Sequence, residues 1–280
     1  MQAQGVWRVA SASVRGASHE LTDAPCQDAH RIEISTASNN QVLVVAVADG
    51  AGTALNGEAG ASIAVTAICE QVSAWVGSGG TVEVLSRETV AEWITGVREQ
   101  IADAAADTIG DMRDYACTLL VAVIDQNAAA FAQIGDGAIV VLTQEREWSW
   151  VFWPQHGPYA NTTYFVTEDA ARDRFEFCTG PRRVNELAVF SDGLEQLVLD
   201  HKARVAHAPF FDRMFPPLRE ASSSGRDHAL SEALADYLLS QTVRARTSDD
   251  VTLVLASRLP PSVVDACSER ADVGEDASSD

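Results

Sequence analysis

Basic residues are scarce in this chain of 280 residues. Lys and Arg together number 20 against 40 Asp and Glu, so the formal net charge is -20 at pH 7 and the pI is about 4.5. Nucleic acids and anionic membranes present phosphates, which require basic surfaces for binding. The composition therefore argues against nucleic-acid and membrane partners. It still permits a phosphorylated substrate, because a bound divalent ion can reverse the local field of an acidic site.

Cysteine is also sparse. The five cysteines form no CxxC motif and no Cys/His cluster, and an odd number suits reduced thiols better than a disulfide framework. We expect most of these thiols to be buried and inert.

Long apolar runs are missing as well. The stretches 42–48 and 119–124 are far too short to span a bilayer. Residues 1–16 have neither the basic n-region nor the apolar h-region of a signal peptide. We therefore expect a cytoplasmic protein, and its 46% of hydrophobic residues can supply the core of one large domain.

Hydrophobic periodicity predicts alternating groups of strands and helices. The predicted strands cover residues 6–14, 30–35, 41–48, 115–124, 128–134, 138–143, 187–190 and 251–256, and the predicted helices cover 57–76, 87–108, 194–199 and 229–239. Asp125-Gln126-Asn127 should form a hairpin turn, and strand 138–143 should continue the same sheet after a tight turn at Asp136. Residues 260–280 are acidic and aperiodic, which predicts a disordered tail.

Four short acidic motifs adjoin the hydrophobic runs. They are Ala48-Asp49-Gly50-Ala51-Gly52, Gly135-Asp136-Gly137, Ser191-Asp192-Gly193 and Asp249-Asp250-Val251-Thr252. Strand ends could bring these carboxylates together, and carboxylates in one place repel one another unless a cation neutralises them. Ligand sets made only of oxygen suit hard ions such as Mg²⁺ or Mn²⁺. The sequence therefore predicts a metal-dependent enzyme.

These motifs, preceded by Gln27-Asp28, occur in an order and approximate spacing that resembles the metal-dependent PPM family, the type 2C serine/threonine protein phosphatases. The match runs from about residue 9 to residue 257. Gly16-Ala17-Ser18-His19 and Ala160-Asn161-Thr162-Thr163 look most like a bacterial branch. The resemblance implies an α+β fold, a four-layer α-β-β-α sandwich of two antiparallel sheets flanked by helices. It implies a phosphatase domain over residues 1–259, followed by the tail at 260–280.

The resemblance also implies a ligand set for the primary metal site. Asp49 would bridge two ions through its carboxylate, with the Gly50 backbone carbonyl on one of them. Asp192 and Asp249 would complete the protein ligands of the primary ion. Asp250 would be a neighbour of the site rather than a ligand.

Two further carboxylates have implied roles. Asp28 would act through water near the second ion, and Asp136 would help to hold a weaker third ion. Two Mg²⁺ or Mn²⁺ ions about 4 Å apart lower the pKa of a bridging water for direct, in-line attack on phosphorus. The implied reaction is hydrolysis of phosphoserine or phosphothreonine in a protein substrate, such as a bacterial Ser/Thr kinase or its target.

The chain departs from the family pattern at the residue that grips the substrate phosphate. Asp23 stands where many members have Arg, five residues before Asp28. His19, Arg15 or Arg31 could substitute for it. We prefer His19 because it lies in the loop that leads to Asp28.

Two other positions also differ. Gln27 replaces the acid that usually precedes Asp28, and Ala51 replaces a His that serves some relatives as a candidate general acid. A metal-bound water or His19 could protonate the leaving group instead. The resulting catalytic candidates are Asp49, Asp192, Asp28 and His19.

Three functions follow from this sequence. We favour a Mg²⁺- or Mn²⁺-dependent protein phosphatase, because Asp49, Asp136, Asp192 and Asp249 are all present. The alterations at three positions leave open a pseudophosphatase that binds a phosphoprotein or kinase without turnover. A metal-dependent phosphohydrolase acting on small molecules is the third alternative. The oligomeric state stays open.

Overall fold

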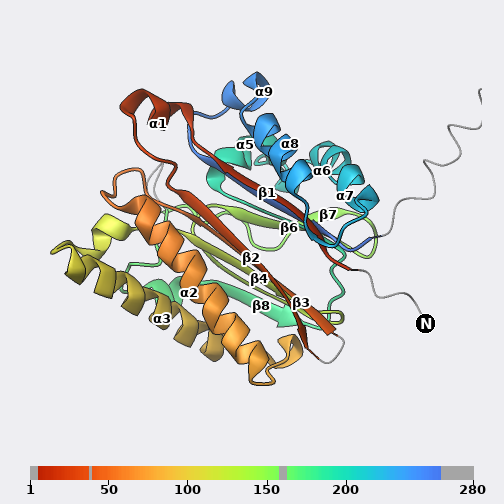
Figure 1. Ribbon diagram of the computed structural model, residues 1–280, viewed down its shortest axis with the longest axis horizontal. Coiled ribbons are helices and arrows are strands. Elements are labelled where there is room, and N and C mark those ends of the chain that lie inside the picture. Colours follow the sequence, from red (N-terminus) through yellow and green to blue (C-terminus); the bar gives the residue numbers. More distant parts are fainter. Residues whose placement is uncertain (1–5, 38–39, 158–162, 260–280) are drawn as a thin grey trace, which may run out of the picture.

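Two β-sheets lie face to face in the computed structural model, and helices cover both outer faces (Figure 1). The structure describes residues 6–37, 40–157 and 163–259. This arrangement confirms the predicted α+β fold with four layers. The predicted disordered tail at 260–280 lies outside the described residues.

The first sheet is antiparallel throughout, with the strand order β2-β3-β4-β5-β8. Its strands are β2 (Asp28–Ala37), β3 (Asn40–Asp49), β4 (Leu119–Ile124), β5 (Ala129–Ile134) and β8 (Glu176–Gly180).

The second sheet has the order β12-β1-β13-β9-β6-β7. Its strands are β1 (Arg8–Val14), β6 (Ala138–Leu142), β7 (Trp148–Trp150), β9 (Glu186–Phe190), β12 (Gly225–Arg226) and β13 (Val251–Ser257). Only the short pairing of β1 with β12 is parallel, so this sheet is mixed rather than purely antiparallel. The strands β10 (Leu199–Asp200) and β11 (Val205–Ala206) form a separate two-stranded ribbon.

Helices α2 (Gly57–Gly77) and α3 (Arg87–Asp107) cover the first sheet, and α6 (Ala208–Met214), α7 (Pro216–Glu220) and α8 (His228–Leu238) cover the second (Figure 1). The shorter helices are α1 (Ala17–Thr22), α4 (Ala171–Arg174), α5 (Glu195–Val198) and α9 (Gln241–Arg244). The 3-10 turns are η1 (Val82–Val84), η2 (Met112–Tyr115) and η3 (Asp192–Leu194).

Strand β3 shows why this sequence forms layers. Leu43, Val45 and Val47 belong to the core between the two sheets, whereas Val44 and Ala46 belong to the core beneath α2 and α3. Successive side chains of a strand point to opposite faces, so a central strand that is apolar at every position is buried on both sides. A third apolar core lies between the second sheet and helices α6 to α8.

Helix α2 is long and apolar enough to cross a membrane by length and composition alone, with 21 residues and a mean hydropathy of 1.2 over its best window. Ten of its residues are buried, and eight of these, including Ala64, Ile68 and Val72, belong to the core that it shares with the first sheet and α3. Its apolar character is therefore explained by its position as a core helix of the sandwich.

Two predictions about local structure are wrong. The segment 138–143 does not continue the first sheet, because β6 pairs with β9 and β7 in the second sheet. The strand predicted from residue 115 begins only at Leu119, since Tyr115 closes the 3-10 turn η2. The turn at Gly135-Asp136-Gly137 thus carries the chain from one sheet to the other, which positions Asp136 between them.

Candidate metal centre

Five carboxylates meet at one end of the sandwich. Asp49 ends β3 and lies directly opposite Asp28, the first residue of β2. Asp192 follows β9 and Asp249 precedes β13, and these two strands are antiparallel neighbours, so both residues lie at the same sheet end. Asp136 occupies the turn between β5 and β6. The convergence expected from the four acidic motifs is therefore present in the fold.

The pKa values of these carboxyl groups are raised by their burial and by one another's charge. Burial, and then the charges of neighbouring carboxylates, raise the pKa of Asp28 and of Asp136 to about 7. Burial, followed by the charges of Asp28 and Asp192, raises the pKa of Asp49 well above its ordinary value. Burial and then Asp192 also raise the pKa of Asp249. Since each carboxylate disfavours ionisation of the others, a cation at this point would relieve the repulsion.

Unpaired oxygens mark where such a cation fits. Asp28 accepts a hydrogen bond from the Ser191 hydroxyl on Oδ2 at 2.7 Å, whereas its Oδ1 is buried and has no partner among the described residues. Asp192 Oδ1 is likewise buried without a partner in the described part of the chain. Buried carboxylate oxygens are costly to leave unpaired. These atoms suit a hard divalent ion, whose preferred ligands are oxygens.

Two glycines allow the ligand-bearing loops to approach each other closely. A Cβ added to Gly193 would lie 2.1 Å from the Asp250 carbonyl oxygen, and one added to Gly16 would lie 2.2 Å from the Asp249 carbonyl carbon. No side chain fits in either space. The loops that carry Asp192 and Asp249 are therefore packed backbone against backbone.

Asp250 connects the loops instead of facing the cation position. It accepts hydrogen bonds from the backbone nitrogens of Gly16 at 2.7 Å and Gln27 at 2.6 Å, and it lies 2.8 Å from His19 Nδ1. These contacts agree with its expected role as a neighbour of the site. They also orient the His19 ring, which lies within electrostatic reach of Asp249.

The other two substitutes considered for the phosphate grip are engaged elsewhere. Arg15 pairs with Asp23 at 3.6 Å and donates to the Ala24 carbonyl. Arg31 pairs with Glu33 on the same strand at 2.9 Å. Among the three, only His19 is tied directly to the ligand-bearing loops.

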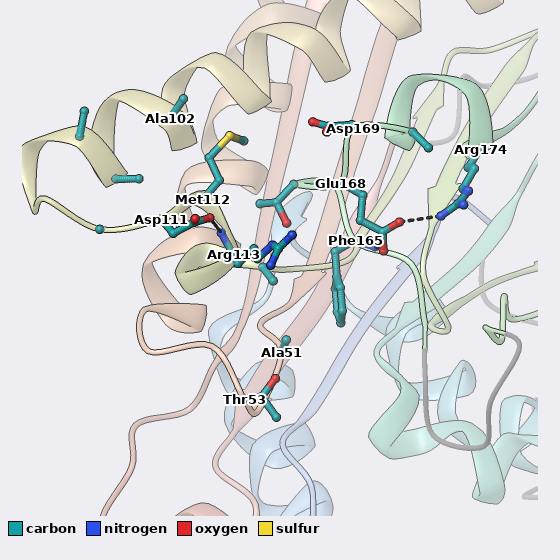
Figure 2. A pocket seen from close by; sticks show the side chains of 16 residues that line it. Ala51, Thr53, Ala102, Asp111, Met112, Arg113, Phe165, Glu168, Asp169 and Arg174 are labelled. Atoms are coloured by element: carbon teal, nitrogen blue, oxygen red, sulfur yellow. Dashed lines mark hydrogen bonds and ion pairs between the residues drawn. The ribbon is translucent and has the colours of Figure 1, made fainter.

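A cavity of about 1030 Å³ extends to the loop that follows Asp49 (Figure 2). Ala51, two residues after Asp49, lies on its wall. Arg174 in this cavity pairs with Glu168 at 2.6 Å, whereas the Arg113 guanidinium has no hydrogen-bond or ion-pair partner among the described residues. The η2 turn that carries Arg113 is held against the loop after β3 by the hydrogen bond from Ala51 N to Ala116 O at 2.8 Å. Sequence reasoning missed Arg113, because only the fold brings η2 to this loop.

A group with two histidines was also missed. Glu195 lies between His156 and His201, and burial followed by the charges of Asp136 and Asp192 raises the pKa of Glu195 to about 8. A sequence signal for Glu195 did exist. It stands three residues after Asp192, and this spacing places two side chains on one face of a helical turn.

Comparison with known proteins decides the family. The family model for protein phosphatase 2C matches residues 15–238. The chain belongs to this family. A serine/threonine-protein phosphatase 3 from Escherichia coli (strain K12) is 37% identical over 253 residues, which cover 89% of this chain and 98% of that protein. The chain is thus a serine/threonine protein phosphatase of the 2C type, a hydrolase, as its resemblance to the family implied.

Solved structures of the same fold agree with this assignment. A bacterial serine phosphatase has a TM-score of 0.61 and 18% identity, and the match covers 91% of this chain and 99% of that one. The catalytic domain of the serine/threonine phosphatase PstP, solved with two manganese ions, has a TM-score of 0.56 and 16% identity over 90% of this chain and 98% of its own. At these identities the structures support the phosphatase fold alone.

Proposed function

We propose that this phosphatase binds Mg²⁺ or Mn²⁺ at the five-carboxylate end of its sandwich and there hydrolyses phosphoserine and phosphothreonine in proteins. The observation that carries this proposal is the convergence of buried carboxylates, two of which, Asp28 and Asp192, each keep a buried oxygen without a partner among the described residues. Asp49 would bridge two ions with help from the Gly50 carbonyl. Asp192 and Asp249 would complete the primary site.

Bound ions would supply a water of lowered pKa and would neutralise charge on the phosphoryl oxygens. The protein positions the carboxylates for that purpose. Ser191 fixes one oxygen of Asp28 and leaves the other facing the centre, which suits contact with the second ion through water. Asp136, in the turn that joins the two sheets, would hold a weaker third ion.

Substrate recognition would use the cavity beside Ala51. Arg113 presents a cation there with no partner among the described residues, and a guanidinium matches the geometry of a phosphate. We assign Arg113 as the first candidate for the phosphate contact that Asp23 does not provide. His19, oriented by Asp250, would serve at the leaving-group side.

The natural substrates would be proteins phosphorylated by a bacterial Ser/Thr kinase, or such a kinase itself. We also propose a cytoplasmic location. The four described cysteines, Cys26, Cys69, Cys117 and Cys178, are all free thiols, which is the usual state in a reducing compartment. The phosphatase domain would extend over residues 1–259.

The test is hydrolysis of a phosphothreonine peptide by the purified chain with Mn²⁺, with Mg²⁺ or with EDTA. Turnover should require the metal, and Asp49→Asn and Asp192→Asn should each reduce kcat by at least about 10³-fold, since each removes a metal-ligand charge. Asp103→Asn, an exposed acid on α3, is the matched control and should leave kcat unchanged.

Three results would contradict this proposal. Undiminished turnover in Asp49→Asn would exclude the proposed centre. A folded, metal-binding protein without turnover of any phosphopeptide or phosphometabolite would indicate the pseudophosphatase instead. A preference for phosphometabolites over phosphoproteins would indicate the small-molecule hydrolase.

A further inference from the structure

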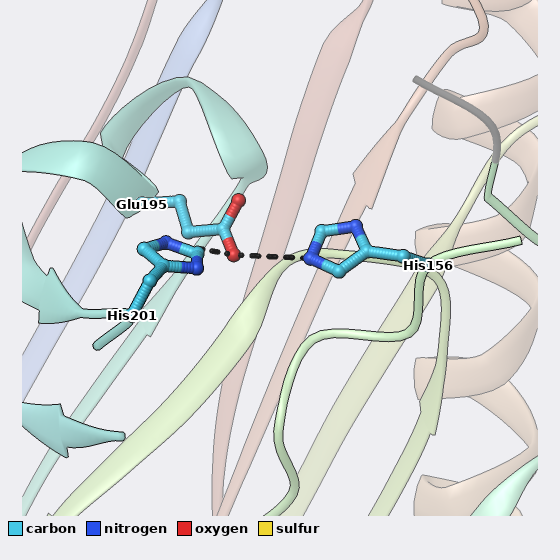
Figure 3. A group of neighbouring side chains, drawn as sticks. All are labelled: His156, Glu195 and His201. Carbon is cyan, nitrogen blue, oxygen red and sulfur yellow. Dashed lines mark ion pairs between the residues drawn. The ribbon is translucent and has the colours of Figure 1, made fainter. Parts of the chain in front are cut away.

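Two imidazoles and one carboxylate converge outside the five-carboxylate centre (Figure 3). His156 comes from the segment after β7, Glu195 opens α5, and His201 follows β10. One ligand atom of each residue lies within 4.8 Å of the other two. Three separate parts of the chain thus place metal-binding atoms at one point.

Two distances within this group are close to those between neighbouring ligands of one metal ion. Glu195 Oε1 lies 3.3 Å from His201 Nε2 and 3.6 Å from His156 Nε2. Ligands bound at 2.0–2.1 Å to a tetrahedral Zn²⁺ ion are roughly 3.3–3.4 Å apart. A charge-assisted hydrogen bond from imidazole to carboxylate would be shorter, at about 2.7–2.9 Å.

The central carboxylate oxygen is not satisfied by the two imidazoles. Glu195 is 8% exposed, and its Oε1 is buried without a hydrogen-bond partner in the described part of the chain, although both histidines face it. A cation between the three atoms would satisfy this oxygen. It would also use the two imidazole nitrogens as neutral donors.

The surroundings favour an exchangeable ion. The side chains of His156 and His201 are 50% and 45% exposed, so the site is open to solvent and an ion could enter and leave it. The ring of Trp153 packs edge-on against His201 with their centroids 5.5 Å apart, which restricts the orientation of that imidazole. Three protein ligands leave a fourth position for water.

The donor set differs in kind from that of the phosphatase centre. Two nitrogens and one oxygen suit a borderline transition-metal ion, whereas sites made only of oxygen suit Mg²⁺ or Mn²⁺. We propose that His156, Glu195 and His201 form a separate, exchangeable site for a transition-metal ion such as Zn²⁺, one helical turn from Asp192. This site does not depend on the proposed catalytic roles of the carboxylate centre.

The test measures Zn²⁺ binding to the metal-free full chain by calorimetry, with millimolar Mg²⁺ present to occupy the oxygen-ligand centre. The wild type should bind one more equivalent of Zn²⁺ than His156→Asn/His201→Asn. Each single His variant and Glu195→Gln should weaken this site at least about tenfold, since the loss of even a supporting partner of a metal ligand commonly costs that much. His228→Asn, an exposed histidine that opens α8, is the matched control and should bind as the wild type does.

Co²⁺ provides a second readout that does not depend on activity. The wild type should show the intense visible absorption of four-coordinate Co²⁺, and the double His variant should lose it while its circular dichroism spectrum stays the same. Equal Zn²⁺ stoichiometry in the wild type and the double variant would overturn the proposal. Loss of the Zn²⁺ equivalent in Asp49→Asn but not in the double His variant would also overturn it, because the ion would then occupy the phosphatase centre.

Discussion

At the residue scale, the carboxylates of the candidate metal centre differ in which of them have hydrogen-bond partners. Asp250 has its oxygens satisfied by Gly16, Gln27 and His19, and it therefore organises the loops. Asp28 and Asp192 each keep a buried oxygen without a described partner. Carboxylates in similar sequence motifs thus have different roles, and hydrogen bonding decides between them.

The prediction at the residue scale concerns the role of Arg113 in substrate binding. Arg113→Ala should raise the KM for a phosphothreonine peptide about tenfold and leave kcat nearly unchanged, because a charge-assisted contact with phosphate contributes about 1.5 kcal/mol. Arg113→Lys should recover part of the loss. Steady-state kinetics measures both effects, with Arg172→Ala, an exposed arginine outside the cavity, as the control. An unchanged KM in Arg113→Ala would remove this residue from the substrate site.

At the element scale, the site depends on how loops and helices are attached to the sheets. The η3 turn is packed against the loop before β13 at Gly193, and η2 is hydrogen-bonded to the loop after β3. Helix α7 is fixed to the second sheet by an ion pair between Arg219 and the buried Glu186 of β9. Single substitutions at Gly193 and at Arg219 test two of these contacts.

Gly193→Ala should lower kcat at least about tenfold and weaken activation by Mn²⁺. Its new Cβ would lie 2.1 Å from the Asp250 carbonyl oxygen, so the loops bearing Asp192 and Asp249 must separate. Displacements of about 1 Å in a catalytic site can cost 10²-fold in rate. Gly52→Ala is the control, since no atom lies within 4 Å of its added Cβ. Equal kcat and Mn²⁺ activation in the two variants would argue against close packing of the loops.

Arg219→Met should lower the free energy of unfolding by about 3–5 kcal/mol, because it leaves a buried charge without its partner. Glu186 is fully buried, and Arg219 donates to it twice, at 2.8 and 2.6 Å. Adding Glu186→Gln should recover part of the loss, since it removes the charge. Urea denaturation measures the three proteins. A loss below about 1 kcal/mol in the single variant would show that this ion pair does not anchor α7.

At the scale of the whole molecule, a partly buried polar network joins the two sheets. His30 of β2 contacts the hydroxyls of Ser13 at 2.8 Å and Ser11 at 3.1 Å, both on β1 of the opposite sheet. Ser13 in turn contacts the Thr252 hydroxyl of β13 at 2.6 Å. Burial first, and then the charge of Arg226, lowers the pKa of His30 to about 4. His30 is therefore neutral in the native sandwich at pH 7.

This network predicts a pH dependence of stability. Between pH 6.5 and 4 the unfolded chain binds a proton at His30 that the native protein does not. The free energy of unfolding should therefore be unaffected by this group above pH 6.5 and should decrease as the pH falls from 6.5 to 4. The expected loss is about 3 kcal/mol at most, from 1.36 kcal/mol per pH unit. Urea denaturation of the wild type and His30→Asn at several pH values should show their difference changing by this amount. An unchanged difference between pH 7 and pH 4 would exclude His30 as its source.

Much of the fold followed from local patterns. Strand β3 was predictable because residues 42–48 form an unbroken apolar run, and α2 and α3 because the spacing of their apolar residues is helical. Strand β6 was assigned to the wrong sheet because an apolar run near a turn has the same local pattern in either sheet. Its true partner, β9, lies almost 50 residues further along the chain, and no short-range signal specifies that pairing.

The sequence by itself indicated the family and the layered fold, and it predicted the carboxylates that we propose as metal ligands. It could do so because strand-end acids beside glycines are local features with a recognisable order. Only the tertiary structure decided which neighbours those carboxylates have, where Arg113 lies, and that His156, Glu195 and His201 meet. These relations depend on distances between segments far apart in the chain, and the packing of two sheets sets those distances.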